Sequence, residues 1–178
     1  MAVPPDFVSG QVLTAAQMNA IGLWEIKSQT IGTGVSSVTV TNAFSADYDN
    51  YRIIVSGGVA STGSDLRMTL GSTTSGYFWA ILYSVWNNTP LASGTTTGTY
   101  MPGIYTSTTV LSGVMDVCNP FAAKNTTFHC NASQSVAGGG SFVTNGFLNN
   151  TTSYTDFTLT TGTGTITGGT IRVYGYRN

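Results

Sequence analysis

The single histidine of the sequence, His129, stands directly beside a cysteine, Cys130, in the stretch TTFHC. A histidine that accepts a thiol proton activates the cysteine as a nucleophile. Adjacent residues of a β-strand point to opposite faces of the sheet, however, and this stretch is predicted to be a strand. One histidine and two cysteines without paired spacing also cannot assemble a structural zinc site within one chain. We therefore expect no catalytic residue, no metal site and no cofactor.

The carboxylates of SADYDNY offer a second chemistry. Asp47 and Asp49 are hard oxygen ligands that suit Ca²⁺, but the loop lacks the further acidic positions of an EF-hand. The favoured interpretation is a capped turn between two strands, with Tyr48 and Tyr51 packed onto the sheet.

The remaining aspartates stand apart from other acidic residues in the sequence. Asp65, Asp116 and Asp156 have no acidic neighbour, so the sequence does not identify a glycosidase pair. The glycines of VAGGGS and TGTGTITGG lack the strand-to-helix context that phosphate-binding and nucleophile motifs need. These observations favour a binding protein over an enzyme.

The two cysteines flank a predicted hairpin. Cys118 and Cys130 would lie roughly opposite each other if the hairpin were centred on Lys124. A disulfide is one outcome, but synthesis in a cytosol favours free, partly buried thiols.

Aromatic residues form the most promising surface. In GYFWAILYSVW, alternation sends Tyr77, Trp79, Ile81, Tyr83 and Val85 to one face, and Phe78, Ala80, Leu82, Ser84 and Trp86 to the other. Both faces are apolar, which favours burial by another subunit over a stacking platform for sugar rings. The following residues, 87–105, are predicted to be the longest irregular loop. The side chains of that loop chosen for glycan contact are Asn87, Asn88, Tyr100 and Tyr105, because amides and flat rings read sugar hydroxyls and faces.

Composition excludes several functions. Charged residues make up 7% of the chain and hydrophobic residues 41%, which indicates a folded protein with a neutral surface. The net charge is -1 and no basic run occurs, so nucleic-acid binding is not expected. The sequence shows no signal-peptide pattern and no stretch long enough to span a bilayer, so we expect cytoplasmic synthesis and no membrane insertion.

The elements that position these residues are predicted to be strands. From Trp24 onward the apolar period is two, and turn clusters separate about ten short segments. The predicted strands are 24–31, 36–44, 51–59, 66–70, 77–86, 110–117, 126–132, 141–148, 157–161 and 170–176. This spacing predicts an all-β domain over residues 24–178, built as an antiparallel β-sandwich of jelly-roll type.

Residues 1–23 are predicted to form a separate N-terminal anchor segment with one short helix. Thr14 and Gln17 have the spacing of a capping box, and Leu13 and Met18 that of a hydrophobic staple, which predicts a helix over residues 15–21. Two helical turns are not stable alone in water, so this helix needs a partner.

The opening stretch FVSGQVLTAAQMNAIG resembles the N-terminal segment of many tailed-bacteriophage virion proteins, especially small tail-fibre and minor tail proteins. FSADYDNYRIIVSG and the terminal GGTIRVYGYRN are similar to such proteins too. The resemblance implies a virion structural protein, commonly a homotrimer, that attaches to other virion proteins through its N-terminus and binds the host surface through a distal β domain. The residues expected to make the anchor or oligomer contacts are Phe7, Val12, Leu13, Met18 and Ile21.

We therefore expect a tail-fibre-like adhesin, located on the virion, that contributes to recognition of host-surface polysaccharide. The first alternative is a capsid decoration or head-fibre protein that ornaments or stabilises the shell. Two further alternatives are an enzyme that degrades surface polysaccharide and a free-standing carbohydrate-binding module.

Overall fold

The structure is a computed structural model and describes residues 9, 10, 12, 23–88 and 90–176. Within residues 23–176 it contains strands and no helix, and so no helix that could cross a membrane. The strands are β1 (Leu23–Thr30), β2 (Ser37–Val40), β3 (Asn50–Ser56), β4 (Val59–Ala60), β5 (Asp65–Leu70), β6 (Tyr77–Val85), β7 (Leu91–Gly98), β8 (Met101–Tyr105), β9 (Ser112–Cys118), β10 (Thr126–Ser133), β11 (Gly140–Leu148), β12 (Phe157–Thr161), β13 (Ile166–Thr167) and β14 (Thr170–Tyr176).

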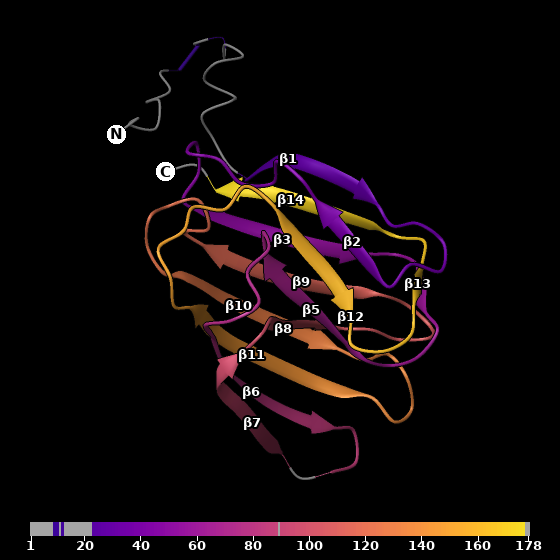
Figure 1. The fold of residues 1–178 in the computed structure, drawn as a ribbon. Coiled ribbons are helices and arrows are strands. Elements are labelled where there is room, and N and C mark those ends of the chain that lie inside the picture. The colour runs from indigo at the N-terminus through magenta and orange to yellow at the C-terminus, as the bar shows by residue number, and fades with distance from the viewer. Residues whose placement is uncertain (1–8, 11, 13–22, 89, 177–178) are drawn as a thin grey trace.

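Three sheets are formed, and every pairing between named strands is antiparallel. The largest sheet has eight strands in the order β1-β14-β3-β9-β10-β11-β6-β7, as Figure 1 shows. A four-stranded sheet has the order β2-β12-β5-β8, and β13 pairs with β4. The predicted all-β, antiparallel class is confirmed.

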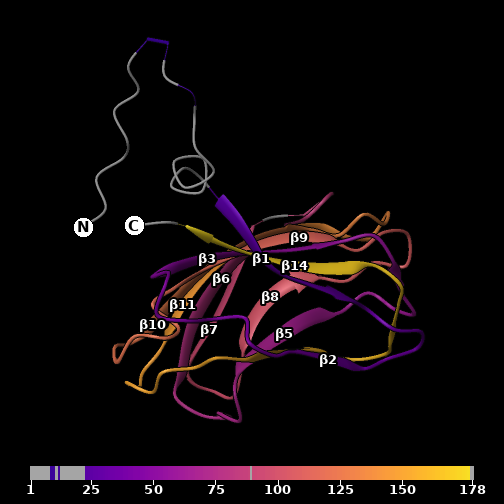
Figure 2. The same ribbon diagram turned by 90° about the horizontal axis from the view of Figure 1, so that it is seen from above.

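The core lies between the two larger sheets. In Figure 2 the layer that holds β2, β5 and β8 faces the layer that holds β3, β9 and β14. Side chains alternate along the strands, so that one set from each sheet is buried, as at Ile53 and Val55 of β3 and at Leu66 and Met68 of β5. β8 also contacts β6, β9, β10 and β11, so it extends the core beneath the middle of the larger sheet.

Residues 87–105 differ from the prediction of one long irregular loop. They form β7, which pairs with β6 at an edge, and β8, which pairs with β5. β7 reads LASGTTTG, and its glycines and exposed threonines gave no apolar alternation to detect. β8 carries Pro102, and proline is tolerated because β8 is an edge strand.

The predicted helix over residues 15–21 lies outside the described residues. Among the anchor residues, Phe7, Leu13, Met18 and Ile21 also lie outside them. Val12 is described, and its side chain is 85% exposed. β1 begins at Leu23, next to the predicted end of the anchor segment.

The turn before β3 is capped as predicted. The Asp47 backbone N–H donates to the Ser45 hydroxyl, which donates to the Asp47 carboxylate. Tyr51 is buried, and its hydroxyl donates to the Ser45 carbonyl at 2.9 Å. Tyr48 packs edge-on against Tyr51, with ring centroids 6.0 Å apart.

The cysteines are not opposite each other. In the β9–β10 hairpin, Cys118 pairs with Thr127 and Cys130 pairs with Met115. The centre of the hairpin lies before Lys124 in the sequence. The two cysteines therefore belong to different cross-strand pairs, and their side chains point to opposite faces of the sheet. Both are free thiols, as the prediction favoured.

Candidate functional site

A pocket of about 480 Å³ opens on the face of the eight-stranded sheet that points away from the four-stranded sheet. Its side chains come from β6, β7, β10 and β11, the four strands at one end of the large sheet (Figure 1). The residues that line it are Phe78, Trp79, Ala80, Thr95, Thr96, Thr127, His129, Asn145, Gly146 and Phe147.

One wall of the pocket is an aromatic pair. Phe78 and Phe147 lie directly opposite each other in the β6–β11 register, and their rings stack with centroids 4.8 Å apart and an interplanar angle of 13°. Both side chains are half-buried. Cross-strand aromatic pairs of this kind stabilise a sheet by about 0.5–1 kcal/mol, so the pair also fixes the local register.

The polar side of the pocket is built on the next cross-strand row. His129 and Asn145 pair in the β10–β11 register, and the His129 Nδ1 lies 2.6 Å from the Asn145 Oδ1. An amide oxygen only accepts, so Nδ1 donates in this arrangement and Nε2 is left to accept. Both side chains are exposed, which leaves the Asn145 amide N–H groups and the imidazole Nε2 facing solvent.

The floor of the pocket is formed by small residues, which leave space above the sheet. Asn145 pairs with Ala80 of β6, and Ala80 pairs with Gly94 of β7. A Cβ at Gly94 would stand 2.9 Å from the Trp79 carbonyl oxygen, so the close approach of β7 to β6 also favours glycine there. A larger side chain at position 80 would fill the pocket.

An ion pair lies beside the pocket, and its two charged groups are bonded to each other. The Arg52 Nε and Nη2 each donate to one oxygen of Asp116 at 2.8 Å, and Asp116 lies next to His129 in the β9–β10 register. The Tyr176 hydroxyl donates to the same carboxylate at 3.2 Å. The Arg52 hydrogen bonds lower the pKa of Asp116, despite its partial burial. The charge beside the pocket is therefore compensated.

The four residues predicted for glycan contact do not gather. Asn87 and Asn88 lie in the turn from β6 to β7, at the Val85 end of β6, and both are exposed. The Asn88 N–H donates to the Val85 carbonyl, which closes the turn. Tyr100 follows the other end of β7, which pairs with Tyr77. The length of β6 therefore separates Tyr100 from the two asparagines by about 26 Å at roughly 3.3 Å per residue.

Tyr105 contacts a buried side chain of the inner face, whereas Tyr100 contacts an arginine of β5. Tyr105 stacks on Phe142 with ring centroids 3.5 Å apart, and burial raises the pKa of its hydroxyl to about 12. The Arg67 guanidinium lies over the Tyr100 ring, 4.4 Å from its centroid. Neither tyrosine lines the pocket.

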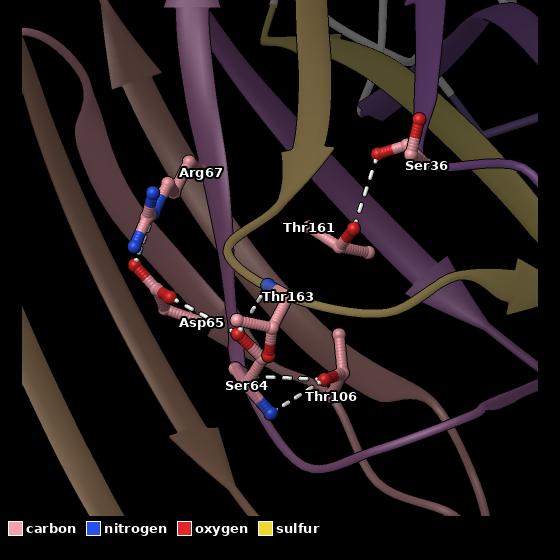
Figure 3. Close-up of polar contacts among 7 residues, drawn as sticks. All are labelled: Ser36, Ser64, Asp65, Arg67, Thr106, Thr161 and Thr163. Carbon is pink, nitrogen blue, oxygen red and sulfur yellow. Dashed lines mark hydrogen bonds and ion pairs between the residues drawn. The ribbon is translucent and has the colours of Figure 1, made fainter.

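A polar network holds Arg67 in place, as Figure 3 shows. The Arg67 Nε donates to Asp65 at 2.7 Å, and the Ser64 hydroxyl donates to the other Asp65 oxygen at 3.2 Å. The Thr106 hydroxyl accepts from the Ser64 N–H and donates to the Ser64 carbonyl. The Thr163 N–H donates to the Ser64 hydroxyl. The loop before β5 is thereby joined to the loops that follow its two neighbouring strands, β8 and β12.

The carboxylates considered for catalysis have separate partners. Asp65 pairs with Arg67, and Asp116 pairs with Arg52. Asp156 accepts from the Asn42 backbone N–H at 2.8 Å. The described part of the chain holds no group of three or more His, Cys, Asp or Glu residues placed to bind a metal ion.

His129 and Cys130 lie on opposite faces, as predicted. His129 is exposed at the pocket, whereas Cys130 is buried in the core, and burial raises the pKa of its thiol to about 12. A thiol of this kind stays protonated near neutral pH and is a poor nucleophile.

No known protein family matches this chain. No curated protein and no solved structure matches it either. The residues of the pocket combine an aromatic wall with threonine hydroxyls, one amide and one imidazole. Such a set suits reversible binding of a ligand that is partly apolar and carries hydroxyl groups.

Sequence reasoning missed Phe147, Asn145 and Thr127 as site residues. The alternation of residues 141–148 predicted a strand, but it gave no sign that this strand pairs with β6. The pairing of Phe147 with Phe78 depends on register between segments 69 positions apart in the chain, since 147 - 78 = 69. The alternation of 77–86 placed Phe78 and Ala80 on one face of the predicted strand, but it did not indicate that this face points outward.

Proposed function

We propose that this chain is a virion structural protein of a tailed bacteriophage, a tail-fibre-like adhesin whose β domain binds host-surface glycan. The observation that carries the proposal is the outward pocket with its stacked Phe78–Phe147 wall and uncharged polar groups. Sugar rings present an apolar face and a rim of hydroxyls, which fit an aromatic wall beside amide and hydroxyl groups. The stretches FVSGQVLTAAQMNAIG and GGTIRVYGYRN support the virion assignment by their resemblance to phage proteins.

The placement of the pocket supports an adhesin. β1, which follows the proposed anchor segment, is one edge of the large sheet, and β7 is the other edge (Figure 1). Seven steps between neighbouring strands separate these edges by about 34 Å. The pocket lies among the last four strands, at the end of the sheet away from β1. A chain attached to the virion through the segment before β1 would thus present the pocket away from the particle.

We extend the proposal to the architecture and the assembly. The orders β1-β14-β3-β9 and β2-β12-β5-β8 carry the chain back and forth between two sheets, which supports a jelly-roll-like sandwich widened by the hairpins β6–β7 and β10–β11. The assembly is a homotrimer whose N-terminal residues, including Phe7, Leu13, Met18 and Ile21, attach it to other virion proteins. The 85% exposed side chain of Val12 is free for such a contact. Three copies per fibre raise weak glycan contacts to useful avidity.

Glycan binding is tested with the full chain on an array of bacterial surface polysaccharides. We expect a subset to bind, and Phe78→Ala to weaken binding about tenfold because a half-buried phenyl face is lost. Asn145→Ala, at an exposed position, removes the amide without a core change and should also weaken binding. Val110→Ala alters an exposed side chain outside the pocket and is the control. Equal binding by wild type and Phe78→Ala, with both folded by circular dichroism, would refute the site.

The virion assignment is tested separately. Antibody labelling of phage particles in the electron microscope should mark the tail, and labelling of the shell would favour the capsid decoration alternative. Deleting residues 1–22 should leave a folded β domain that no longer joins particles. Release of oligosaccharide from host polysaccharide during incubation would instead indicate an enzyme.

A further inference from the structure

The pocket borders on an exposed apolar pair. Val143 of β11 and Leu82 of β6 lie directly opposite each other and point outward, with side chains 41% and 64% exposed. They stand two residues along their strands from Asn145 and Ala80, which line the pocket. Two residues of a strand span about 6.6 Å, so the pair flanks the low floor on the side opposite Phe78 and Phe147.

The two sides of the pocket floor differ in chemical character. Phe78 and Phe147 offer a flat wall on one side, and Val143 and Leu82 offer branched aliphatic groups on the other, with the floor at Ala80 between them. A sugar ring over Ala80 would have its substituents directed at Val143 and Leu82. Hydroxyl groups there would lose hydrogen bonds to water without gaining a partner, whereas a methyl group would lose none.

The charges at the site favour a neutral ligand. Both oxygens of Asp116 accept from Arg52, so neither repels nor attracts a ligand strongly. Asp116 is not itself a lining residue, and the lining residues that carry a hydroxyl, amide or imidazole group are Thr95, Thr96, Thr127, Asn145 and His129. No lysine or arginine is among the lining residues to bind a carboxylate or phosphate.

We infer that the pocket selects neutral sugars that carry a methyl group, with that methyl packed against Leu82 and Val143. This inference rests on the proposed glycan-binding function and names the ligand class of the same site. Two kinds of sugar supply the group: deoxy sugars, in which a methyl replaces a hydroxymethyl, and N-acetylated sugars. His129 and Asn145 then contact the hydroxyl groups on the polar side of the ring.

The test compares sugars matched around the methyl group. Saturation-transfer NMR and titration of the full chain with L-fucose against L-galactose, which carries a hydroxymethyl instead of the methyl, test the deoxy sugars. N-acetylglucosamine against N-formylglucosamine, which keeps the amide but lacks the methyl, tests the N-acetylated sugars. Burial of one methyl should tighten binding about fourfold. The methyl protons should also receive the strongest saturation. The pair that shows the preference identifies the source of the methyl.

Matched variants locate the effect. In the double variant Leu82→Thr and Val143→Thr, the methyl preference should fall to none, because threonine keeps the strand shape but presents a hydroxyl. Val110→Thr is the control, because Val110 has the same 41% exposure as Val143 but lies between β8 and β9, outside the four strands that build the pocket. It should leave the preference unchanged.

The inference is overturned if the members of both pairs bind equally, or if the double variant keeps the preference. In either case, binding that still depends on Phe78 leaves the proposed function standing. If no sugar or surface polysaccharide binds at all, both the inference and the proposed function are wrong.

Discussion

Gly146→Ala is expected to destabilise the protein, although glycine inside a strand is normally the weaker choice. Alanine in place of a strand glycine stabilises by about 0.5–1 kcal/mol when space allows. Here a Cβ would stand 2.2 Å from the Phe78 carbonyl oxygen and 2.6 Å from the Phe128 Cζ. The first contact is with backbone, which cannot rotate away, and Phe128 is fully buried.

The magnitude follows from these contacts. Ordinary contact needs about 3.5 Å, so β6 and β11 must separate locally by about 1 Å. Overpacking of this kind costs about 1–3 kcal/mol, which exceeds the gain from lower chain entropy in the unfolded state. We expect a net loss of about 2 kcal/mol, or a fall in Tm of about 4–8 °C for a chain of this size.

Thermal and urea unfolding followed by circular dichroism measure the effect. Gly138→Ala is the matched control, because a Cβ at Gly138 meets nothing within 4 Å. It should change stability by less than about 0.5 kcal/mol. Glycan binding should weaken in Gly146→Ala alone, since the backbone of Phe78 moves. A Gly146→Ala protein as stable as wild type would refute the packing described for β6, β10 and β11.

Two further predictions concern buried titrating groups. Alkylation at neutral pH without reductant, followed by mass spectrometry, should find no disulfide. Cys118 should be modified in the folded protein, and the buried Cys130 only after unfolding. A disulfide between Cys118 and Cys130 would contradict the β9–β10 register. Burial raises the pKa of Tyr77 to about 12, so the folded state holds this proton more tightly than the unfolded state, whose pKa is about 10. Stability from Tyr77 is then fully present below about pH 10 and is lost as the pH rises towards about 12, which urea unfolding across that range would measure; Tyr77→Phe should flatten that part of the profile.

The sequence predicted the class of the fold and the division of residues 77–86 into two faces. Alternation in 77–86 correctly separated buried Tyr77 and Ile81 from outward Phe78, Ala80 and Leu82, because period two follows directly from strand geometry. The capped turn at Asp47 could also be predicted, because its hydrogen bonds join residues that are close in the sequence.

Features that depend on pairing between distant segments were not predicted. β7 lacks apolar alternation, since it is an exposed edge strand held by backbone bonds to β6. The cysteine pairing failed because the centre of the β9–β10 hairpin depends on its loop, which sequence symmetry does not fix. Asn87 and Tyr100 were grouped as one loop, but β7 runs between them and places them at opposite ends.

The pocket and the core share the same strands, and this has a consequence for how recognition can change. Along β10, His129 faces outward between Phe128 and Cys130, which face the interior. Along β11, Asn145 and Val143 point outward on either side of buried Thr144. A library confined to the outward positions would therefore vary ligand preference on a constant framework. Under the proposed adhesin function, a change of host would then require the exchange of only a few side chains, with the strands that display them unchanged.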